Sequence, residues 1–138
     1  LMVRRIFEQV DALGGSKKMI FHRLLRLSRF LRTKFGIRVG KKLFGKIHER
    51  FGPQFRMFAV GAASFAPATG ETLLDLGFDM FQAYGMTETT GPATIDPLGP
   101  YGGMTCGKPL KHSRVKIHEP NEEGIGEVLM GGEHLTPG

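Results

Sequence analysis

The sequence predicts an α/β fold, because a helical first third is followed by the strand–helix–strand spacing of a parallel sheet. The chain has 138 residues, 41% of them hydrophobic, which is enough for one modest domain. We expect a basic helical segment at residues 1–54 and a strand-rich segment at 55–138, as two parts of one incomplete domain. Because the chain starts at Leu1 and stops at Gly138 without a terminal signal, we expect an internal fragment.

Two amphipathic helices are expected first. Apolar residues recur every three or four positions from Val3 to Leu13, and Gly14-Gly15 then interrupts the pattern. Ser16 is the expected N-cap of the second helix, and Gly36 is its expected end. The predicted inward stripe of this second helix consists of Ile20, Leu24, Leu27 and Leu31.

A third helix is expected from Lys41 to Phe51, before a Gly-Pro pair. It overlaps one of two segments, Gly40 to Lys46 and Gly102 to Lys108, that fit the G-x-x-x-x-G-K pattern of a phosphate-binding loop. That loop needs Ser or Thr at the next position to bind magnesium, whereas Ile47 and Pro109 stand there. We therefore attribute both matches to chance.

A strand, a helix and a second strand are expected next. Residues 55–60 alternate and are β-prone, and they run into the small-residue turn at 61–64. Pro67 suits the first position of a helix, and Gly77 suits its C-terminal cap. A short strand follows at 79–83. This spacing predicts a βαβ unit with two parallel strands.

In parallel sheets, ligands gather beyond the carboxyl ends of the strands, so we expect the site at residues 61–64 and 84–90. A loop rich in Gly and Pro is expected at 91–105. Two further strands are expected at 114–118 and 126–130, joined by a turn at 120–124.

Charge is distributed unevenly along the chain. Residues 1–50 contain 14 Lys and Arg against 3 Asp and Glu, whereas residues 51–138 contain 5 against 10.

A single Cys106 excludes an intramolecular disulfide, and the histidines lack the spacing of a zinc motif. No apolar run reaches the roughly 20 residues of a membrane span, and no signal peptide is evident. We expect a cytoplasmic protein. Two interpretations of its basic residues 16–50 stay open: peripheral contact with a membrane, or the solvated face of helices that pack on a core.

The most informative segment is Tyr84 to Thr90, at the expected end of the second parallel strand. Tyr84 offers a flat face for a purine base, and Gly85 permits a backbone turn. Thr87 can hydrogen-bond a phosphate, and Glu88 can hold magnesium, which takes only one or two protein carboxylates. Without further support, a turn with a solvated cap is the commoner explanation of such residues.

The run Tyr84 to Thr89 resembles the Y-G-x-T-E motif of the adenylate-forming superfamily, which includes acyl-CoA synthetases, firefly luciferase and the adenylation domains of peptide synthetases. Other segments resemble the superfamily in the same order along the chain. They are Gly61-Ala62-Ala63 (the adenine segment), Cys106 to Leu110 with Val115 to Ile117 (V-G-x-P-x and x-V-K-I), and Gly126 to Leu129 with Gly131 (G-E-I-x-x-x-G). The opening Val3 to Glu8 resembles the V-P-R-x-x-E segment of long-chain acyl-CoA synthetases, with Arg4 in place of Pro.

The resemblance implies part of the large N-terminal domain of a fatty acyl-CoA synthetase. The expected reaction joins a long-chain fatty acid to AMP from ATP and then to CoA, with Mg²⁺ as the metal. The implied catalytic residues are Thr87 and Glu88, the latter also as metal ligand, and the implied nucleotide-binding residues are Gly61, Ala62, Ala63, Tyr84, Gly85, Met86 and Thr87. The family's phosphate loop, ribose-binding Asp and C-terminal Lys are absent, so the fragment is expected to be inactive alone.

Two alternatives remain open. The basic helices could form a nucleic-acid-binding module, although no helix-turn-helix, RNA-binding or zinc motif accompanies them and we expect no nucleic acid as partner. The parent could instead be an aryl-acid or amino-acid adenylating member of the same superfamily. The basic helical stretch argues against this second alternative, because adenylation domains of peptide synthetases usually lack it.

Overall fold

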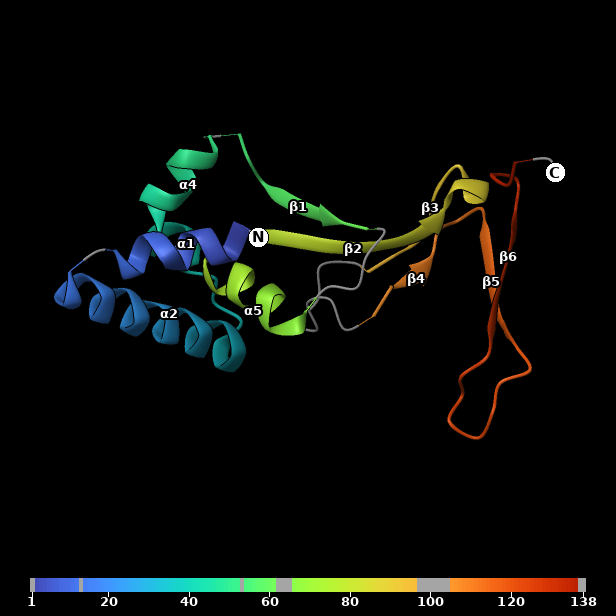
Figure 1. Cartoon of the computed structure of the whole chain (residues 1–138), viewed down its shortest axis with the longest axis horizontal. Coiled ribbons are helices and arrows are strands. Elements are labelled where there is room, and N and C mark those ends of the chain that lie inside the picture. The colour runs from blue at the N-terminus through green and yellow to red at the C-terminus, as the bar shows by residue number, and fades with distance from the viewer. Residues whose placement is uncertain (1, 13, 53, 62–65, 97–104, 137–138) are drawn as a thin grey trace.

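The structure is a computed structural model that describes residues 2–12, 14–52, 54–61, 66–96 and 105–136. The α-helices gather at one end of an elongated molecule, and the strands extend from them to a hairpin at the other end (Figure 1). The helices are α1 (Met2–Asp11), α2 (Gly15–Phe35), α3 (Gly40–Leu43), α4 (Gly45–Phe51), α5 (Pro67–Asp75) and the 3-10 helix η1 (Thr87–Thr89). The strands are β1 (Met57–Val60), β2 (Asp79–Met86), β3 (Gly91–Ile95), β4 (Lys108–Pro109), β5 (Ser113–His118) and β6 (Glu127–Gly132).

The ends of α2 confirm one prediction and correct another. Gly36 is the C-cap in the left-handed conformation, with φ 68°, and its N–H donates to the Arg32 carbonyl. The N-cap, however, is Gly14 rather than Ser16, which lies in the first turn of the helix. Gly has no side-chain oxygen to cap the free N–H groups, so the helix begins without a side-chain cap.

The inward stripe predicted for α2 is partly wrong. Ile20 is 55% exposed and Leu27 is 45% exposed, whereas Phe21 is 9% exposed and Ser28 is 2% exposed. The buried face is therefore rotated from the predicted stripe, although Leu24 still packs against the core. The rotation has a polar cause, because Ser28 and its neighbours face a buried carboxylate on α5.

That carboxylate belongs to Asp75, which is completely buried. Arg29 Nε donates to it at 2.6 Å, and Arg32 donates from Nε at 3.0 Å and from Nη2 at 2.8 Å. The Ser28 hydroxyl donates to the Asp75 carbonyl oxygen at 2.6 Å. Burial alone would lower the pKa of Arg32, but its bonds to Glu71 and Asp75 outweigh burial and raise the pKa above its usual value. The guanidinium therefore stays charged and joins α2 to α5.

The third predicted helix is divided into α3 and α4 at Phe44. Gly40, the first residue of α3, lies against the turn after α5, where a Cβ on it would lie 2.4 Å from the Gly77 nitrogen. Gly77 has φ 91°, and a Cβ added to it would clash in turn with the backbone of Lys41. Gly40 begins the first of the two segments that fit the phosphate-loop pattern, and its lack of a side chain allows α3 to pack against the turn after α5. This role agrees with the rejection of a phosphate loop.

The hydrophobic core lies between the helices and the start of the sheet. Phe78 is 1% exposed, and the His48 ring stacks on it with centroids 4.0 Å apart. His48 Nε2 lies 2.9 Å from the Leu76 carbonyl oxygen, which satisfies this buried ring nitrogen. The buried apolar residues of this cluster are Val10, Phe21, Phe44, Leu73, Leu74, Leu76, Phe78 and Met80.

The predicted parallel pair is confirmed, with β1 beside β2 in a register that sets Met57 opposite Asp79. Pro67 is at the first position of the connecting helix α5, as predicted. The second strand is longer than predicted and continues to Met86. The predicted loop at 91–105 is wrong at its start, because β3 pairs antiparallel with β2 over 91–95, and its residues 97–104 lie outside the described residues. Strand β4, which pairs with β3, was not predicted.

The last two strands are confirmed. β5 and β6 pair antiparallel over six residues each, and the turn between them is held by the Asn121 Oδ1 atom. This oxygen accepts from the N–H groups of Glu123 at 3.0 Å and Ile125 at 2.9 Å. The predicted α/β fold class is therefore correct.

Candidate functional site

Gly61 is the one residue of the first predicted site segment, 61–64, that the structure describes, and it lies beside the strand that leads into the second segment. Val60, the last residue of β1, is opposite Gln82, so Gly61 lies beside Ala83. A Cβ on Gly61 would lie 3.4 Å from the Ala83 carbonyl oxygen. Ala62 and Ala63, the other predicted adenine-segment residues, lie outside the described residues. The carboxyl end of β1 is thus adjacent to the stretch that begins at Tyr84, as the parallel pairing requires.

Tyr84, Gly85 and Met86 are part of β2 and not of a loop after it. The pairing with β3 shifts between Tyr84 and Gly85, which makes a β-bulge of the kind often found beside functional sites. Tyr84 is 37% exposed and Met86 is 43% exposed, so both side chains reach the surface. A ring in this position can stack on a planar base.

The predicted role of Gly85 in a backbone turn is wrong. It lies in the strand, and a Cβ there would be 2.3 Å from the Gly91 carbonyl oxygen and 2.9 Å from the Pro92 Cα. Gly is required because two backbones approach closely at the bulge, and the space where its side chain would lie is filled by the neighbouring strand.

The turn after β2 is tied together by Thr89, which is 1% exposed. Its hydroxyl oxygen accepts from the Met86 N–H at 2.9 Å and lies 2.6 Å from the Gly91 carbonyl oxygen, to which it can donate. The Thr90 N–H donates to the Thr87 carbonyl at 3.0 Å and completes η1. Thr89 therefore has the structural role of closing the connection between β2 and β3.

Thr87 and Glu88 are exposed at the surface of this turn. Within the described residues, neither the Thr87 hydroxyl nor the Glu88 carboxylate has a hydrogen-bonded or ionic partner. Both are thus available to a ligand, and a free carboxylate with a neighbouring hydroxyl suits a hard cation that carries phosphate oxygens. No cluster of three or more potential metal ligands occurs in the described ranges, so any contribution of Glu88 to a metal site is not part of such a cluster.

A third segment, which the sequence did not indicate, contacts the turn. The Thr136 N–H donates to the Glu88 carbonyl oxygen at 2.9 Å, and the Thr90 hydroxyl donates to the His134 carbonyl oxygen at 2.7 Å. Figure 1 shows η1, in yellow, beside the red end of the chain that follows β6. No local pattern around Thr136 signals this contact, because it joins residues 48 positions apart.

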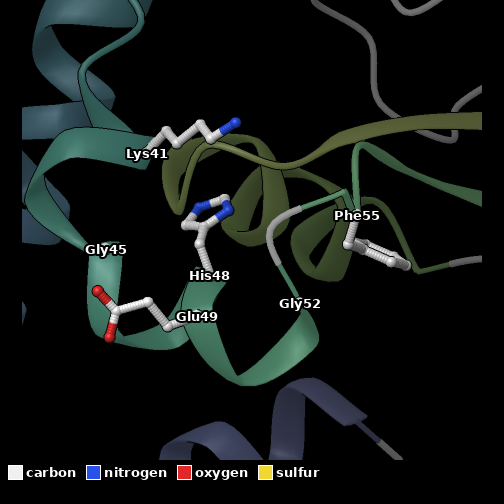
Figure 2. Close-up of a pocket in the computed structure, with 6 residues that line it drawn as sticks. All are labelled: Lys41, Gly45, His48, Glu49, Gly52 and Phe55. Carbon is white, nitrogen blue, oxygen red and sulfur yellow. The ribbon is translucent and has the colours of Figure 1, made fainter.

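A hollow of about 480 Å³ lies elsewhere, and Figure 2 shows its lining. His48 lies in it with its ring against the core, and Phe55 closes one side. Phe55 precedes β1, whereas Gly61 follows this strand. The hollow therefore lies at the opposite end of β1 from the predicted site, and its residues are Lys41, Gly45, His48, Glu49, Gly52 and Phe55.

The exposed Thr87 and Glu88 lie beyond the carboxyl end of a strand in a parallel pair, which is where open α/β sheets bind their ligands. Residues 15–138 match the family model of the AMP-binding enzymes, and the chain belongs to this family. The predicted membership of the adenylate-forming superfamily is thereby confirmed. None of the helices in the part of the chain that the structure describes is both long and apolar enough to cross a bilayer.

Curated relatives include long-chain-fatty-acid–CoA ligases. The chain is 33% identical to Long-chain-fatty-acid–CoA ligase ACSBG2 of Xenopus laevis over 99 residues, which cover 71% of this chain and 13% of that protein. It is 32% identical to the Homo sapiens protein of the same name over 108 residues, which cover 77% of this chain and 16% of that protein. The chain thus spans a small part of the length of these relatives.

Two solved structures resemble the fold of this chain. The N-terminal domain of FACL13 from Mycobacterium tuberculosis matches with a TM-score of 0.51 at 19% identity, over 80% of this chain and 27% of that chain. A double mutant of o-succinylbenzoate CoA synthetase from Bacillus subtilis, bound to a product analogue, matches with a TM-score of 0.50 at 26% identity, over 69% of this chain and 22% of that chain. These similarities support the predicted fold class.

Proposed function

We propose that this chain is a segment of an AMP-forming acyl-CoA synthetase that activates a long-chain fatty acid, and that the segment is inactive alone. The observation that carries the proposal is the free Thr87 hydroxyl and Glu88 carboxylate beyond the carboxyl end of β2, the strand whose Ala83 lies beside Gly61. Membership of the AMP-binding enzymes and the names of the curated relatives support the reaction class and the substrate.

In the proposed reaction, a fatty acid carboxylate oxygen bonds to the α-phosphorus of ATP while the bond from that phosphorus to the bridging oxygen breaks. Pyrophosphate leaves with the bonding electrons. The CoA sulfur, as thiolate, then bonds to the acyl carbon and AMP leaves. Both steps place negative charge on phosphate oxygens, and positioned donors and cations stabilise that charge.

The proposed roles follow from where each side chain lies. Glu88 would hold Mg²⁺, which supplies positive charge to the phosphates, and Thr87 would donate its hydroxyl hydrogen to a phosphate oxygen. The exposed Tyr84 ring would stack on the adenine, with Gly61 beside it. Ala62, Ala63, Gly85 and Met86 complete the proposed nucleotide-binding set from the resemblance.

The test is pyrophosphate release from ATP by the complete protein with a panel of fatty, aryl and amino acids. We expect release that depends on a long-chain acid and falls about 100-fold or more in Glu88→Ala, as removal of charge stabilisation at a transferring phosphate does. The control is Glu122→Ala, an exposed carboxylate on the β5–β6 turn, which should retain full activity. Full activity of Glu88→Ala would disprove the site, and release only with an aryl or amino acid would disprove the substrate.

We also propose that the protein is cytoplasmic and contacts anionic membranes peripherally through the outward face of α2. Phe30 lies nine residues after the buried Phe21, about two and a half turns along the helix, and so faces away from the core. It is 52% exposed, as is Met19, and the exposed Arg23 and Arg26 lie beside them. The helix contains seven Lys and Arg residues and no Asp or Glu. Exposed apolar and basic side chains on one face match an anionic lipid surface.

Vesicle sedimentation tests this contact. The complete protein should bind vesicles of phosphatidylcholine with phosphatidylserine, bind vesicles of phosphatidylcholine alone far less, and lose binding about 10-fold when Arg23 and Arg26 are both changed to Glu. The matched control changes the exposed Lys111 and Arg114 to Glu. Equal binding by both double variants would contradict the proposal. Salt-sensitive binding of this face to RNA but not to vesicles would favour the nucleic-acid alternative instead.

A further inference from the structure

The turn that carries Glu88 is not held by its own residues alone. Thr89 secures the ends of the turn at Met86 and Gly91, but none of its hydrogen bonds reaches Glu88. The Glu88 carbonyl oxygen instead accepts from the Thr136 N–H at 2.9 Å and from the Thr136 hydroxyl at 3.3 Å. The backbone of the proposed metal ligand is therefore fixed by a residue beyond β6.

A second bond joins the same two segments. The Thr90 hydroxyl, one residue past η1, donates to the His134 carbonyl oxygen at 2.7 Å. Thr90 has φ 50°, a left-handed conformation that is unfavourable for a β-branched residue. A Gly would adopt it more easily, so the threonine is explained by its hydroxyl bond and not by its backbone.

The partner segment is itself anchored on the β5–β6 hairpin. The His134 ring lies over Gly132, where an added Cβ would be 2.7 Å from ring atoms. His134 Nε2 also lies 3.4 Å from the Ser113 hydroxyl at the start of β5. The segment 133–136 thus connects the hairpin, which carries neither Thr87 nor Glu88, to the turn that carries both.

We propose that Thr136 and Thr90 are positioning residues of the adenylation reaction. By fixing the Glu88 backbone against the hairpin, they set the direction in which the free Glu88 carboxylate meets the magnesium nucleotide. This inference rests on the proposed function. Residues that orient a metal ligand commonly change metal affinity when replaced, although they do not touch the ion.

The experiment uses the complete protein and measures pyrophosphate release as a function of Mg²⁺ concentration. In Thr90→Ala, we expect the Mg²⁺ concentration for half-maximal rate to rise on the order of 10-fold. In Thr136→Ala, the rise should be smaller. The KM for the fatty acid should be unchanged in both variants. Thr136→Ala should have the smaller effect because the backbone N–H of residue 136 remains. Thr90→Ser and Thr136→Ser retain a hydroxyl and should restore the wild-type Mg²⁺ dependence.

Thr90→Gly separates positioning from folding stability. It removes the hydroxyl bond to His134 but relieves the left-handed backbone, so its unfolding temperature should not fall while its Mg²⁺ requirement rises. A wild-type Mg²⁺ dependence in Thr90→Gly, Thr90→Ala and Thr136→Ala would overturn the inference. Glu88→Ala, assayed in parallel, distinguishes the two failures: if it is inactive while those variants behave as wild type, the proposed function survives and only the positioning role is lost.

Discussion

The helical end and the hairpin end of this molecule are built in different ways. Among the described residues, the buried apolar side chains run from Val10 to Met80, and Ala93 is the only one that follows. The hairpin end instead has half-exposed apolar residues, such as Ile117 at 40% and Leu129 at 41%. The helical end is therefore held by packing and a buried ion cluster, and the hairpin end by backbone hydrogen bonds between strands.

The candidate site and the buried ion cluster therefore lie in different regions of the molecule. Thr87 and Glu88 lie on the weakly packed side, where free polar groups face solvent and a ligand can reach them. The completely buried Asp75 lies on the packed side, with all its polar atoms engaged. The helical end acts as the rigid support, and β2 extends from it to the site.

One of the two largest expected effects is at the ion cluster. Asp75→Ala removes the carboxylate shared by Arg29 and Arg32, and it leaves the mostly buried Arg32 with Glu71 alone. Breaking a buried ion pair in this way costs about 3–5 kcal/mol. The free energy of opening of α5, from amide hydrogen exchange in the complete protein, measures it. A loss below about 1 kcal/mol would show that the cluster does not stabilise the helical end.

A pair of core truncations tests the comparison directly. Phe78→Ala removes a ring that is 1% exposed and should cost about 3–5 kcal/mol in hydrogen-exchange protection. Leu129→Ala removes a side chain that is 41% exposed and should cost less than about 1 kcal/mol. If the Leu129 variant lost as much stability as the Phe78 variant, the hairpin end would be packed in the complete protein as tightly as the helical end.

The contact between α3 and the turn after α5 gives an intermediate effect. Gly40→Ala places a Cβ 2.4 Å from the Gly77 nitrogen and 2.5 Å from the Asp75 carbonyl oxygen, both of them backbone atoms that cannot move aside easily. We expect a loss of about 1–3 kcal/mol, measured as before. Gly45→Ala is the matched control, because nothing lies within 4 Å of its added Cβ. Equal losses in the two variants would contradict a steric cause.

The smallest effect is expected at a surface ion pair on the helical end. Lys18 Nζ lies 2.8 Å from Asp11 Oδ1, and both side chains are about half exposed, at 47% and 55%. Solvent screens such a pair, so Asp11→Ala should change stability by less than about 1 kcal/mol in the same exchange experiment. A change as large as that of Asp75→Ala would mean that burial does not distinguish the two carboxylates.

Several features of the fold followed from local sequence. The end of α2 at Gly36 and the start of α5 at Pro67 were both predicted, because the backbone preferences of these two residues decide the local conformation. The parallel pairing of β1 and β2 followed from the spacing of the elements. The division at 54 and the catalytic roles of Thr87 and Glu88 stay predictions.

The errors occurred where distant residues decide. Ile20 and Leu27 are apolar but exposed, because Ser28 and Arg32 face Asp75, which lies 47 and 43 residues away from them along the chain. Gly85 was wrongly assigned to a turn. A side chain is excluded at this position by the backbone of the opposite strand and not by the φ angle of Gly85, and the sequence alone does not show that strand.

Local chemistry thus determined the class of fold and the order of the elements, because caps and periodicity act over a few positions. The candidate site residues came from the resemblance of short motifs to a known family. The face that α2 buries, the length of β2 and the anchoring of Glu88 by Thr136 were decided by the tertiary structure. Each depends on hydrogen bonds or close backbone contacts between segments that only folding brings together, and no pattern within either segment specifies its partner.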